Sequence, residues 1–273
     1  MEDLQGKVAV VTGAASGIGE ALVYGFAAAG MRTVVADIDI DNAEKVAGRL
    51  GGKGSATMAV RVDVSDPASV DALADAVYAE FGAAHVVCNN AGVLLFTEFG
   101  ESTLEDWQWV YGVNVMGTIH GVLSFLPRMQ EGGEPGHIVN TASIAALGAT
   151  GIYGTSKAAI LTLTESLADE LDGSPIGVTA LFPGQLRSMI TDAERNRPAD
   201  LGEKRNHPYK EYAGKVGLDP STCADRLIDA IKAGDRYVFA GIPESPEYGF
   251  ATIEQRRHDA IMAAIEAGVV PES

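Results

Sequence analysis

The segment YGTSK places a phenol and an ammonium one helical turn apart. Tyr153 and Lys157 are four residues apart, so on a helix they share one face and can reach the same ligand. A nearby ammonium favours the phenolate, so a tyrosine with an ordinary pKa of about 10 would titrate nearer neutrality and could accept or donate a proton. The spacing is common on helices of any kind, so it indicates acid–base chemistry only together with other motifs.

A glycine-rich turn lies near the start of the chain. Residues 12–19 read TGAASGIG, directly after an apolar strand-like run and before a helical pattern that continues to about Ala29. Strand, glycine turn and helix in this order are typical of a dinucleotide site, because the free amides and the dipole at the helix start attract a pyrophosphate. We expect Gly13 to form the tight turn, Gly17 to leave room for the pyrophosphate and Gly19 to let helix pack on strand.

An acidic residue follows this turn at the distance that a ribose contact requires. Asp37 ends the second strand-like run, 18 residues beyond Gly19. Its carboxylate would accept hydrogen bonds from both hydroxyls of an adenosine ribose and would repel a 2′-phosphate. Neither Ala15 nor Ile38 offers a basic side chain for such a phosphate, so the sequence predicts NAD rather than NADP. The alternatives are a solvated Asp37 and a ribose contact made by Asp39.

The elements that must position these residues follow a regular alternation. Short apolar runs, rich in β-branched residues, are separated by 12 to 25 residues compatible with helices. This alternation predicts βα crossovers and a parallel sheet that is covered on both faces. We therefore expect a doubly wound α/β chain, a Rossmann fold, as a single domain over residues 1–273. The expected strands are 7–12, 32–36, 57–62, 85–88, 137–141, 176–182 and 236–240.

Two long amphipathic helices stand out. One is predicted to begin at Ser102, with Glu105 completing a capping box, and to be broken at Pro127. Trp109 in this helix could stack on a ligand, although core packing is the favoured interpretation. The other is predicted to run from near Tyr153 to about 172.

Two further segments interrupt the alternation. Residues 185–220 mix charge, proline and aromatic residues without a sustained period, which is typical of a substrate lid or a disordered insert. Residues 241–273 form a C-terminal extension, in which 253–265 could be a final helix.

Composition excludes several classes of protein. The chain has 273 residues with 20 basic and 37 acidic side chains, a formal net charge of −17, so it would repel nucleic acid. Cys88 and Cys223 are its only cysteines, and we expect both to be buried thiols. Free thiols are typical of a protein in a reducing cytoplasm. The start of the chain lacks the basic residues of a signal peptide, and no apolar run has the length of a membrane span. The five histidines show no metal-binding spacing, so no metal site is expected.

Taken in order along the chain, these motifs resemble the short-chain dehydrogenase/reductase family, in the form with chains of about 250 residues. The resemblance runs from Gly6 to about Ser188. Its motifs are TGAASGIG at 12–19, Asp63 with Val64, NNAG at 89–92, Asn114, a strand ending at Ser143, YGTSK at 153–157 and PGQLRS at 183–188.

The resemblance implies a role for each matching residue. Tyr153 would be the general acid/base, Ser143 the hydrogen-bond donor to the substrate oxygen, and Lys157 the cation that lowers the tyrosine pKa and binds the nicotinamide ribose. Asn114, in the middle of the 102–127 helix, would hold a water that links Lys157 to solvent. The residues implied to bind the dinucleotide are Gly13, Ser16, Gly17, Ile18, Gly19, Asp37, Asp63, Val64, Asn90, Ala91, Gly92, Tyr153, Lys157, Pro183, Gly184, Leu186 and Ser188.

One departure from the family concerns the loop after the serine. Ser143 and Tyr153 are ten residues apart, whereas the family usually has about thirteen, which puts in doubt any substrate inferred from relatives. Thr141 is the alternative donor, since it lies two residues earlier on the same side of the strand.

The expected function is NAD-dependent interconversion of a secondary alcohol and a ketone. The substrate would be a small molecule, with a bulky aromatic, benzylic or cyclic alcohol as a lead. The alternative is a dinucleotide-sensing protein of the same fold without catalysis. The resemblance also implies a homodimer or homotetramer. From the charge and the apolar runs, neither nucleic acid nor a membrane is expected as a partner.

Overall fold

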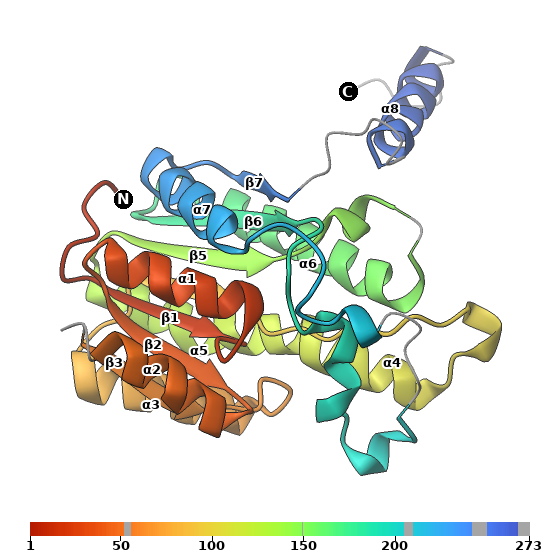
Figure 1. Cartoon of the computed structure of the whole chain (residues 1–273). Helices are drawn as coiled ribbons and strands as arrows, with labels where there is room; N and C mark the ends of the chain where they lie inside the picture. The colour runs from red at the N-terminus through yellow and green to blue at the C-terminus, as the bar shows by residue number, and fades with distance from the viewer. Residues whose placement is uncertain (52–55, 149, 205–209, 242–249, 267–273) are drawn as a thin grey trace.

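The described residues form one sheet of seven parallel strands (Figure 1). The computed structural model describes residues 1–51, 56–148, 150–204, 210–241 and 250–266. Within these ranges the strand order is β3-β2-β1-β4-β5-β6-β7. The strands are β1 (Val8–Thr12), β2 (Arg32–Asp37), β3 (Thr57–Arg61), β4 (Val86–Asn89), β5 (Gly136–Thr141), β6 (Ile176–Pro183) and β7 (Tyr237–Ala240). Each lies within a residue of its expected position, because β-branched residues buried on both faces favour a parallel strand.

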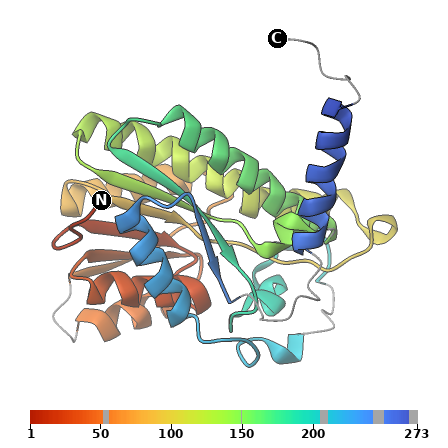
Figure 2. The same cartoon turned by 90° about the horizontal axis from the view of Figure 1, so that it is seen from above.

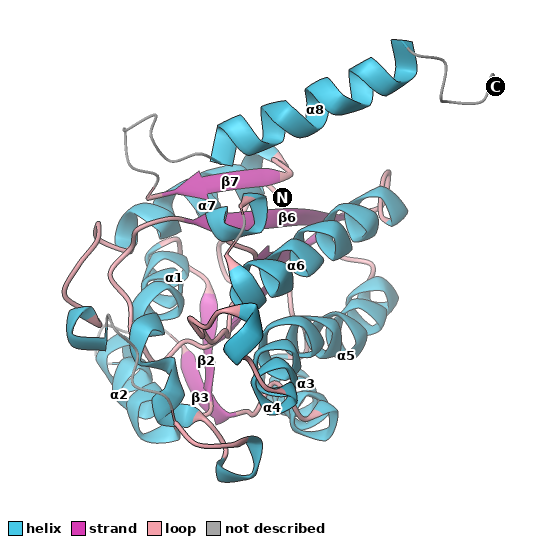
Figure 3. Cartoon of the chain, turned by 90° about the vertical axis from the view of Figure 1, so that its right-hand side faces the viewer, coloured by secondary structure: helices cyan, strands magenta, loops and turns pink. Residues whose placement is uncertain are grey.

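Helices cover both faces of the sheet (Figure 3). One layer holds α1 (Gly17–Ala28), α2 (Ile40–Gly51) and α7 (Ser221–Ala233), and the other holds α3 (Pro67–Phe81), α5 (Gly117–Gly132) and α6 (Gly151–Glu170). Each layer buries its own apolar cluster against the strands, with Phe26 in the first and Phe125 in the second. This arrangement confirms the doubly wound α/β fold and the single domain.

The helix around Trp109 differs from the prediction at both ends. Its first segment, α4 (Leu104–Tyr111), is capped by Thr103, which forms the capping box with Asp106, so the assignment of Ser102 and Glu105 is wrong by one residue. Pro127 does not break α5, which continues to Gly132. Pro127 is exposed, and so is Leu123, whose carbonyl loses its helical partner to the proline. Water can satisfy that carbonyl, so the helix tolerates the residue.

The segment expected to be a lid folds into three short 3₁₀ turns near the carboxyl edge of the sheet. They are η4 (Ile190–Asn196), η5 (Ala199–Leu201) and η6 (Lys210–Tyr212). The segment begins beside a single bridge between Leu186 and Leu218. Residues 205–209 lie outside the described residues.

A buried arginine attaches this segment to α4. Arg197 Nη2 donates a hydrogen bond of 2.7 Å to Asp106 Oδ1, and Arg197 Nε donates one of 2.9 Å to the carbonyl of Leu201. The guanidinium also lies 5.2 Å from the ring centre of Trp109. The side chains of Arg197 and Asp106 are each 1% exposed, so the ion pair is fully enclosed.

The C-terminal extension contains the expected helix. This helix, α8 (Phe250–Glu266), lies beyond β7 and projects from the body of the fold (Figure 2). Residues 242–249 and 267–273 of the extension lie outside the described part. Among the described helices, the continuous segment Leu104–Gly132 is long and apolar enough to span a membrane, but 56% of its most apolar window is buried in the fold. The length test alone is therefore weak evidence for a span.

His137 gives the fold a predictable dependence on pH. It lies buried in β5, where its Nε2 is 2.7 Å from Thr179 Oγ1, and that hydroxyl donates its proton to the carbonyl of Asp235. Nε2 must therefore carry a proton and donate it to Thr179. Burial lowers the pKa of His137 to about 4.

We expect acid to destabilise the folded chain through this histidine. Below its ordinary pKa of 6.5 the unfolded chain binds a proton that folded His137 does not accept until about pH 4. The contribution is fully present above pH 6.5 and is lost as pH falls towards 4, in total about 3 kcal/mol. Urea unfolding at several pH values measures it. His137→Gln should flatten this slope, whereas His258→Gln, an exposed control, should leave it unchanged; equal slopes in all three proteins would contradict the assignment.

Candidate active site

The motif residues line one cleft at the carboxyl edge of the sheet. The cleft begins where the strand order reverses, between β1 and β4, which is the usual ligand position in doubly wound folds. Its volume is about 250 Å³. The floor is formed by the strand ends, and Met189, Ile190 and Ala193 line it from the lid segment.

The glycine-rich turn crosses one end of the cleft. Gly13 has a φ of 66°, and a Cβ there would lie 2.7 Å from the Cα of Ala91. A Cβ on Gly19 would lie 2.2 Å from the carbonyl oxygen of Gly13, so only glycine allows helix and turn to approach this closely. Ser16 precedes α1 and makes no side-chain capping bond, which leaves the first amides of the helix available to an anion.

Gly17 lies at the edge of the cleft, against the start of the lid segment. A Cβ on Gly17 would lie 3.0 Å from the Cβ of Ser188, and Gly17 lies in a shallow groove between α1 and α7 outside the main cleft. The absence of a side chain leaves room for Ser188 at the start of the lid segment, and the role of Gly17 towards a pyrophosphate stays a prediction. Its φ of 60° also favours glycine.

Asp37 lies against the glycine turn. Its Oδ2 accepts a hydrogen bond of 2.9 Å from the amide of Ala15, and its Oδ1 accepts one of 2.9 Å from the amide of Asp39. Each carboxylate oxygen can accept a further bond, so both could receive ribose hydroxyls. Burial raises the pKa of Asp37, and the two amide hydrogen bonds oppose that rise. Asp39 does not line the cleft; it accepts hydrogen bonds from Asn42 instead.

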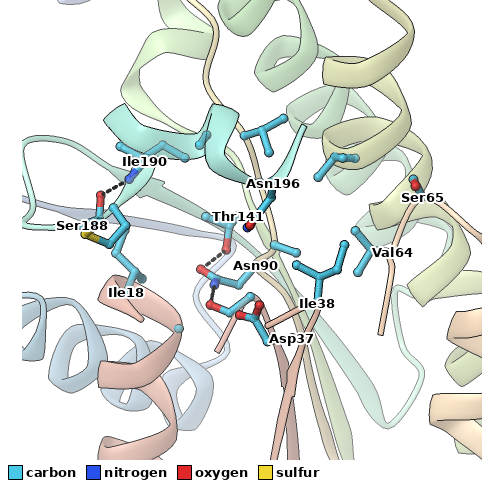
Figure 4. Close-up of a pocket in the computed structure, with 18 of the residues that line it drawn as sticks. Ile18, Asp37, Ile38, Val64, Ser65, Asn90, Thr141, Ser188, Ile190 and Asn196 are labelled. Carbon is cyan, nitrogen blue, oxygen red and sulfur yellow. Dashed lines mark hydrogen bonds between the residues drawn. The ribbon is translucent and has the colours of Figure 1, made fainter. Parts of the chain in front are cut away.

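A hydrogen-bonded group of polar side chains joins the two ends of the cleft (Figure 4). Asn90 Nδ2 donates to the carbonyl of Thr12 at 2.9 Å, and Asn90 Oδ1 accepts a bond of 3.3 Å from Thr141 Oγ1. Thr12 Oγ1 in turn accepts from the amides of Asn90 and Ala91. These bonds fix the segment after β4 against the glycine turn.

Tyr153, Ser143 and Lys157 meet at the other end. Ser143 caps a short 3₁₀ turn, η3 (Ile144–Leu147), just beyond β5, and Tyr153 lies in the first turn of α6. Lys157, one turn later, has its Nζ 5.7 Å from the centre of the Tyr153 ring and donates a hydrogen bond of 2.8 Å to the carbonyl of Thr141. A phenol, a hydroxyl and an ammonium thus surround a point where a substrate oxygen could exchange a proton.

The electrostatics of this group differ from the expectation. Burial raises the pKa of Tyr153, and a hydrogen bond with Ser143 partly lowers it again. Burial also lowers the pKa of Lys157 to about 7. The expected lowering of the tyrosine pKa by Lys157 is not found, because the ammonium is directed to a carbonyl and its own charge is disfavoured by burial.

Asn114 lies behind the cleft rather than in it. It is fully buried in a π-helical turn, η2 (Gly112–Met116), between α4 and α5, so the helix expected over 102–127 is not uniform. Its Oδ1 accepts from the amide of Val93 at 2.8 Å, and its Nδ2 donates to the Val93 carbonyl and to Ser156 Oγ, each at 3.0 Å. Asn114 therefore joins the segment after β4 to α6, and its role in a water relay stays a prediction.

The remaining predicted residues lie where the motifs indicated. Apart from Gly17 and Asn114, every residue expected to bind cofactor or substrate lines the cleft: Gly13, Ser16, Ile18, Gly19, Asp37, Asp63, Val64, Asn90, Ala91, Gly92, Ser143, Tyr153, Lys157, Pro183, Gly184, Leu186 and Ser188. Thr141, the alternative donor, lines it too, but its hydroxyl is bonded to Asn90.

Sequence reasoning missed several lining residues and gave Trp109 only as an alternative. Trp109 is 2% exposed and packs in a core cluster, as the favoured interpretation had it, yet it also lines the cleft beside Gln108. Arg195 and Asn196 line it from the lid segment. No local motif marks Arg195 and Asn196, since they reach the cleft only through the path of the lid segment, and Gln108 and Trp109 reach it through the position of α4.

The residues present fit a dinucleotide. The amides at the start of α1 and the cradle at Gly13 and Gly19 suit a pyrophosphate. Asp37 suits a ribose, and Lys157 lies at the far end beside Tyr153. A hydride acceptor held between these ends would place its reactive carbon near the phenol.

Comparison with known proteins agrees with this arrangement. The family model described as short chain dehydrogenase matches residues 7–199. A C alpha-dehydrogenase from Sphingobium sp. strain SYK-6 is 35% identical over 244 residues, which cover 86% of this chain and 79% of that protein. A 1-deoxy-11-beta-hydroxypentalenate dehydrogenase from Streptomyces avermitilis is 35% identical over 260 residues, which cover 93% of this chain and 92% of that one.

A solved structure extends the similarity to the whole fold. A short chain dehydrogenase/reductase from Burkholderia phymatum, crystallised in complex with NAD, superposes with a TM-score of 0.88 at 37% identity. The match covers 96% of this chain and 97% of that one. The glycine turn, the tyrosine–lysine helix and these matches together show that the chain belongs to the short-chain dehydrogenase family and is an oxidoreductase of that family.

Proposed function

We propose that this oxidoreductase interconverts a secondary alcohol and a ketone with NAD as the hydride acceptor. The observation that carries the proposal is the meeting of Tyr153, Ser143 and Lys157 at the end of a cleft that starts at the glycine turn. Bound NAD would supply the hydride acceptor, as nicotinamide cofactors do.

The chain's own residues would manage the proton and the charge on oxygen. Oxidation of a carbinol requires removal of the hydroxyl proton as the carbonyl forms, and the Tyr153 hydroxyl, once ionised, accepts that proton. Ser143 donates a hydrogen bond to the same oxygen and stabilises the charge that develops on it. In reduction the tyrosine returns the proton. Because burial raises the pKa of Tyr153, alcohol oxidation should gain from alkaline pH more than ketone reduction does.

The lining of the cleft favours an apolar substrate. The walls of the cleft include Val93, Trp109 and Val113, with Met189 and Ile190 from the lid segment. Burial of apolar surface is the main source of affinity in such a pocket. The similar proteins named above are dehydrogenases, one of them for a hydroxypentalenate. We propose a bulky aromatic, benzylic or cyclic alcohol.

A spectrophotometric screen tests the proposal. Purified protein is incubated with NAD or NADP and a panel of benzylic, cyclic and steroid alcohols, and NADH formation is followed by its absorbance. We expect sustained turnover of at least one alcohol, faster with NAD than with NADP. Dinucleotide binding without turnover of any alcohol or of the matching ketones would favour the non-catalytic sensor.

The choice between NAD and NADP depends on Asp37. Asp37→Ala should lower kcat/KM for NAD by about 10-fold to 100-fold, which corresponds to the loss of a charge-assisted hydrogen bond. The kcat/KM for NADP should fall less, because the variant also loses a charge that repels the 2′-phosphate. The ratio of the two kcat/KM values is the measurement. Asp39→Ala is the matched control, since that carboxylate lies outside the cleft, and it should leave the ratio nearly unchanged. An unchanged ratio in Asp37→Ala would contradict the assignment of Asp37.

A further inference from the structure

Few charged side chains line the cleft. Among the described residues that form its walls, Asp37 and Asp63 are acidic, and Lys157 and Arg195 are basic. Lys157 lies at the Tyr153 end, where it is bonded to the Thr141 carbonyl. Arg195 is therefore the basic side chain available to the part of the cleft that contains the glycine turn.

Arg195 belongs to η4 of the lid segment. Its Nη1 donates hydrogen bonds to the carbonyls of Met189 and Asp192, at 3.0 and 2.9 Å. Within the described part of the chain no partner is found for its Nε or Nη2, and the residue is exposed. The guanidinium is thus held by one of its nitrogens while the rest of its donors can meet a ligand.

Arg195 is attached to a part of the lid segment that packs on the glycine turn. Its Nη1 donates to the carbonyl of Met189, and the preceding Ser188 lies against Gly17, where a Cβ would be 3.0 Å from the Cβ of Ser188. Burial raises the pKa of Asp37, and the charge of Arg195 is among the effects that oppose that rise, together with the hydrogen bonds from Asp39 and Ala15. Asp37 is bonded to the amide of Ala15 inside the glycine turn. In Figure 4 the neighbouring Asn196 lies on the cleft side of the lid, above Asn90.

The backbone around Arg195 is fixed by the buried ion pair. Arg197, two residues later, holds the segment to Asp106 of α4 and to the carbonyl of Leu201. Ordering the arginine on binding therefore costs mainly its own side-chain entropy.

A second arginine near the turn is already occupied. Arg187 follows the cleft-lining Leu186, but its guanidinium is ion-paired with Asp219 at the shallow groove between α1 and α7. It does not line the main cleft. A bound pyrophosphate carries two negative charges, in a protein whose net charge is −17. Near it, those charges can be compensated by the amides of the glycine turn and by Arg195.

We propose that Arg195 pairs with the pyrophosphate of the bound dinucleotide, so that the lid segment forms part of the cofactor site as well as the wall of the substrate pocket. This inference rests on the proposed function, because it assumes a dinucleotide in the cleft. Charge-assisted hydrogen bonds from arginine to phosphate are strong and directional, whereas Lys at the same position would supply only a point charge.

Titration of NADH fluorescence with Arg195→Ala tests the proposal. We expect the Kd of NADH to rise about tenfold at low salt, with a smaller difference at high salt because ions screen an exposed pair. Arg195→Lys should give an intermediate Kd. Lys215→Ala is the matched control: it removes one exposed positive charge from the same irregular segment, outside the cleft, and should change the Kd less than about twofold.

Dinucleotide fragments separate the pyrophosphate from the rest of the ligand. The inhibition constant Ki of ADP-ribose, obtained by competition with NADH, should be higher for Arg195→Ala by the same factor. The Ki of adenosine should be equal for the two proteins. A loss confined to NADPH would assign the arginine to a 2′-phosphate and overturn the pairing proposed. If the wild type binds NADH and Arg195→Ala binds it with the same Kd, this inference alone is overturned. If the wild type binds no dinucleotide, the proposed function is overturned as well.

Discussion

Tyr153→Phe should lower kcat for alcohol oxidation by about 10² to 10⁴-fold, the usual contribution of a positioned general acid or base. The substitution removes one oxygen atom and keeps the ring that packs in the first turn of α6. Lys157 contacts the carbonyl of Thr141 rather than the phenol oxygen, so its position should not change. We therefore expect NADH to bind the variant with nearly the wild-type Kd.

Two measurements check this result. Steady-state rates give the loss in kcat, and NADH fluorescence shows whether the cleft still binds dinucleotide. Tyr212→Phe is the control, because Tyr212 is 47% exposed on η6 and does not line the cleft, and its rates should stay within about twofold. Full turnover in Tyr153→Phe would mean that another group, such as Thr141, transfers the proton.

Arg197→Ala should lower the free energy of unfolding more than any other single substitution named above. The variant would leave Asp106 without its buried counter-charge, and Glu194, whose Oε1 is 3.5 Å from Arg197 Nη1, would lose a neighbouring cation. Breaking a buried pair by removing one partner costs about 3 to 5 kcal/mol. For a chain of this size the thermal midpoint should fall by roughly 10 °C.

The lid segment should respond with the rest of the fold. Without Arg197 the hydrogen bonds to Leu201 are lost, so η4 and η5 should exchange their amides faster and KM for the substrate should rise. Arg236→Ala is the matched control: it removes an ion pair with Asp169 whose side chains are 41% and 71% exposed, and should cost less than about 1 kcal/mol.

A double variant identifies the cause of the loss. If the loss of the Arg197 charge beside Asp106 is responsible, Asp106→Asn added to Arg197→Ala should recover part of the stability, because it removes the negative charge of the buried carboxylate. Equal losses in Arg197→Ala and Arg236→Ala would show that the buried pair contributes little to the fold.

The sequence alone predicted the features that depend on neighbouring residues within one helix, strand or turn. Tyr153 and Lys157 share a face of α6 because four residues make about one helical turn. The glycine turn and Asp37 were found from the order of strand, turn and helix, and both lie at the same end of the cleft. The strands were placed within a residue because fully buried parallel strands need unbroken apolar runs.

Tertiary structure decided the contacts between segments that are distant in the sequence. Arg197 meets Asp106 across 91 residues, and that ion pair determines that Arg195 and Asn196 reach the cleft from the lid segment. The sequence also did not predict the partner of the Lys157 ammonium. Helical spacing gives the face of the helix on which a side chain lies, but it does not show that the ammonium bonds to the carbonyl of Thr141. Local propensity encodes turns and faces, whereas burial, pKa and the path of a loop without periodicity depend on the packing of the whole chain.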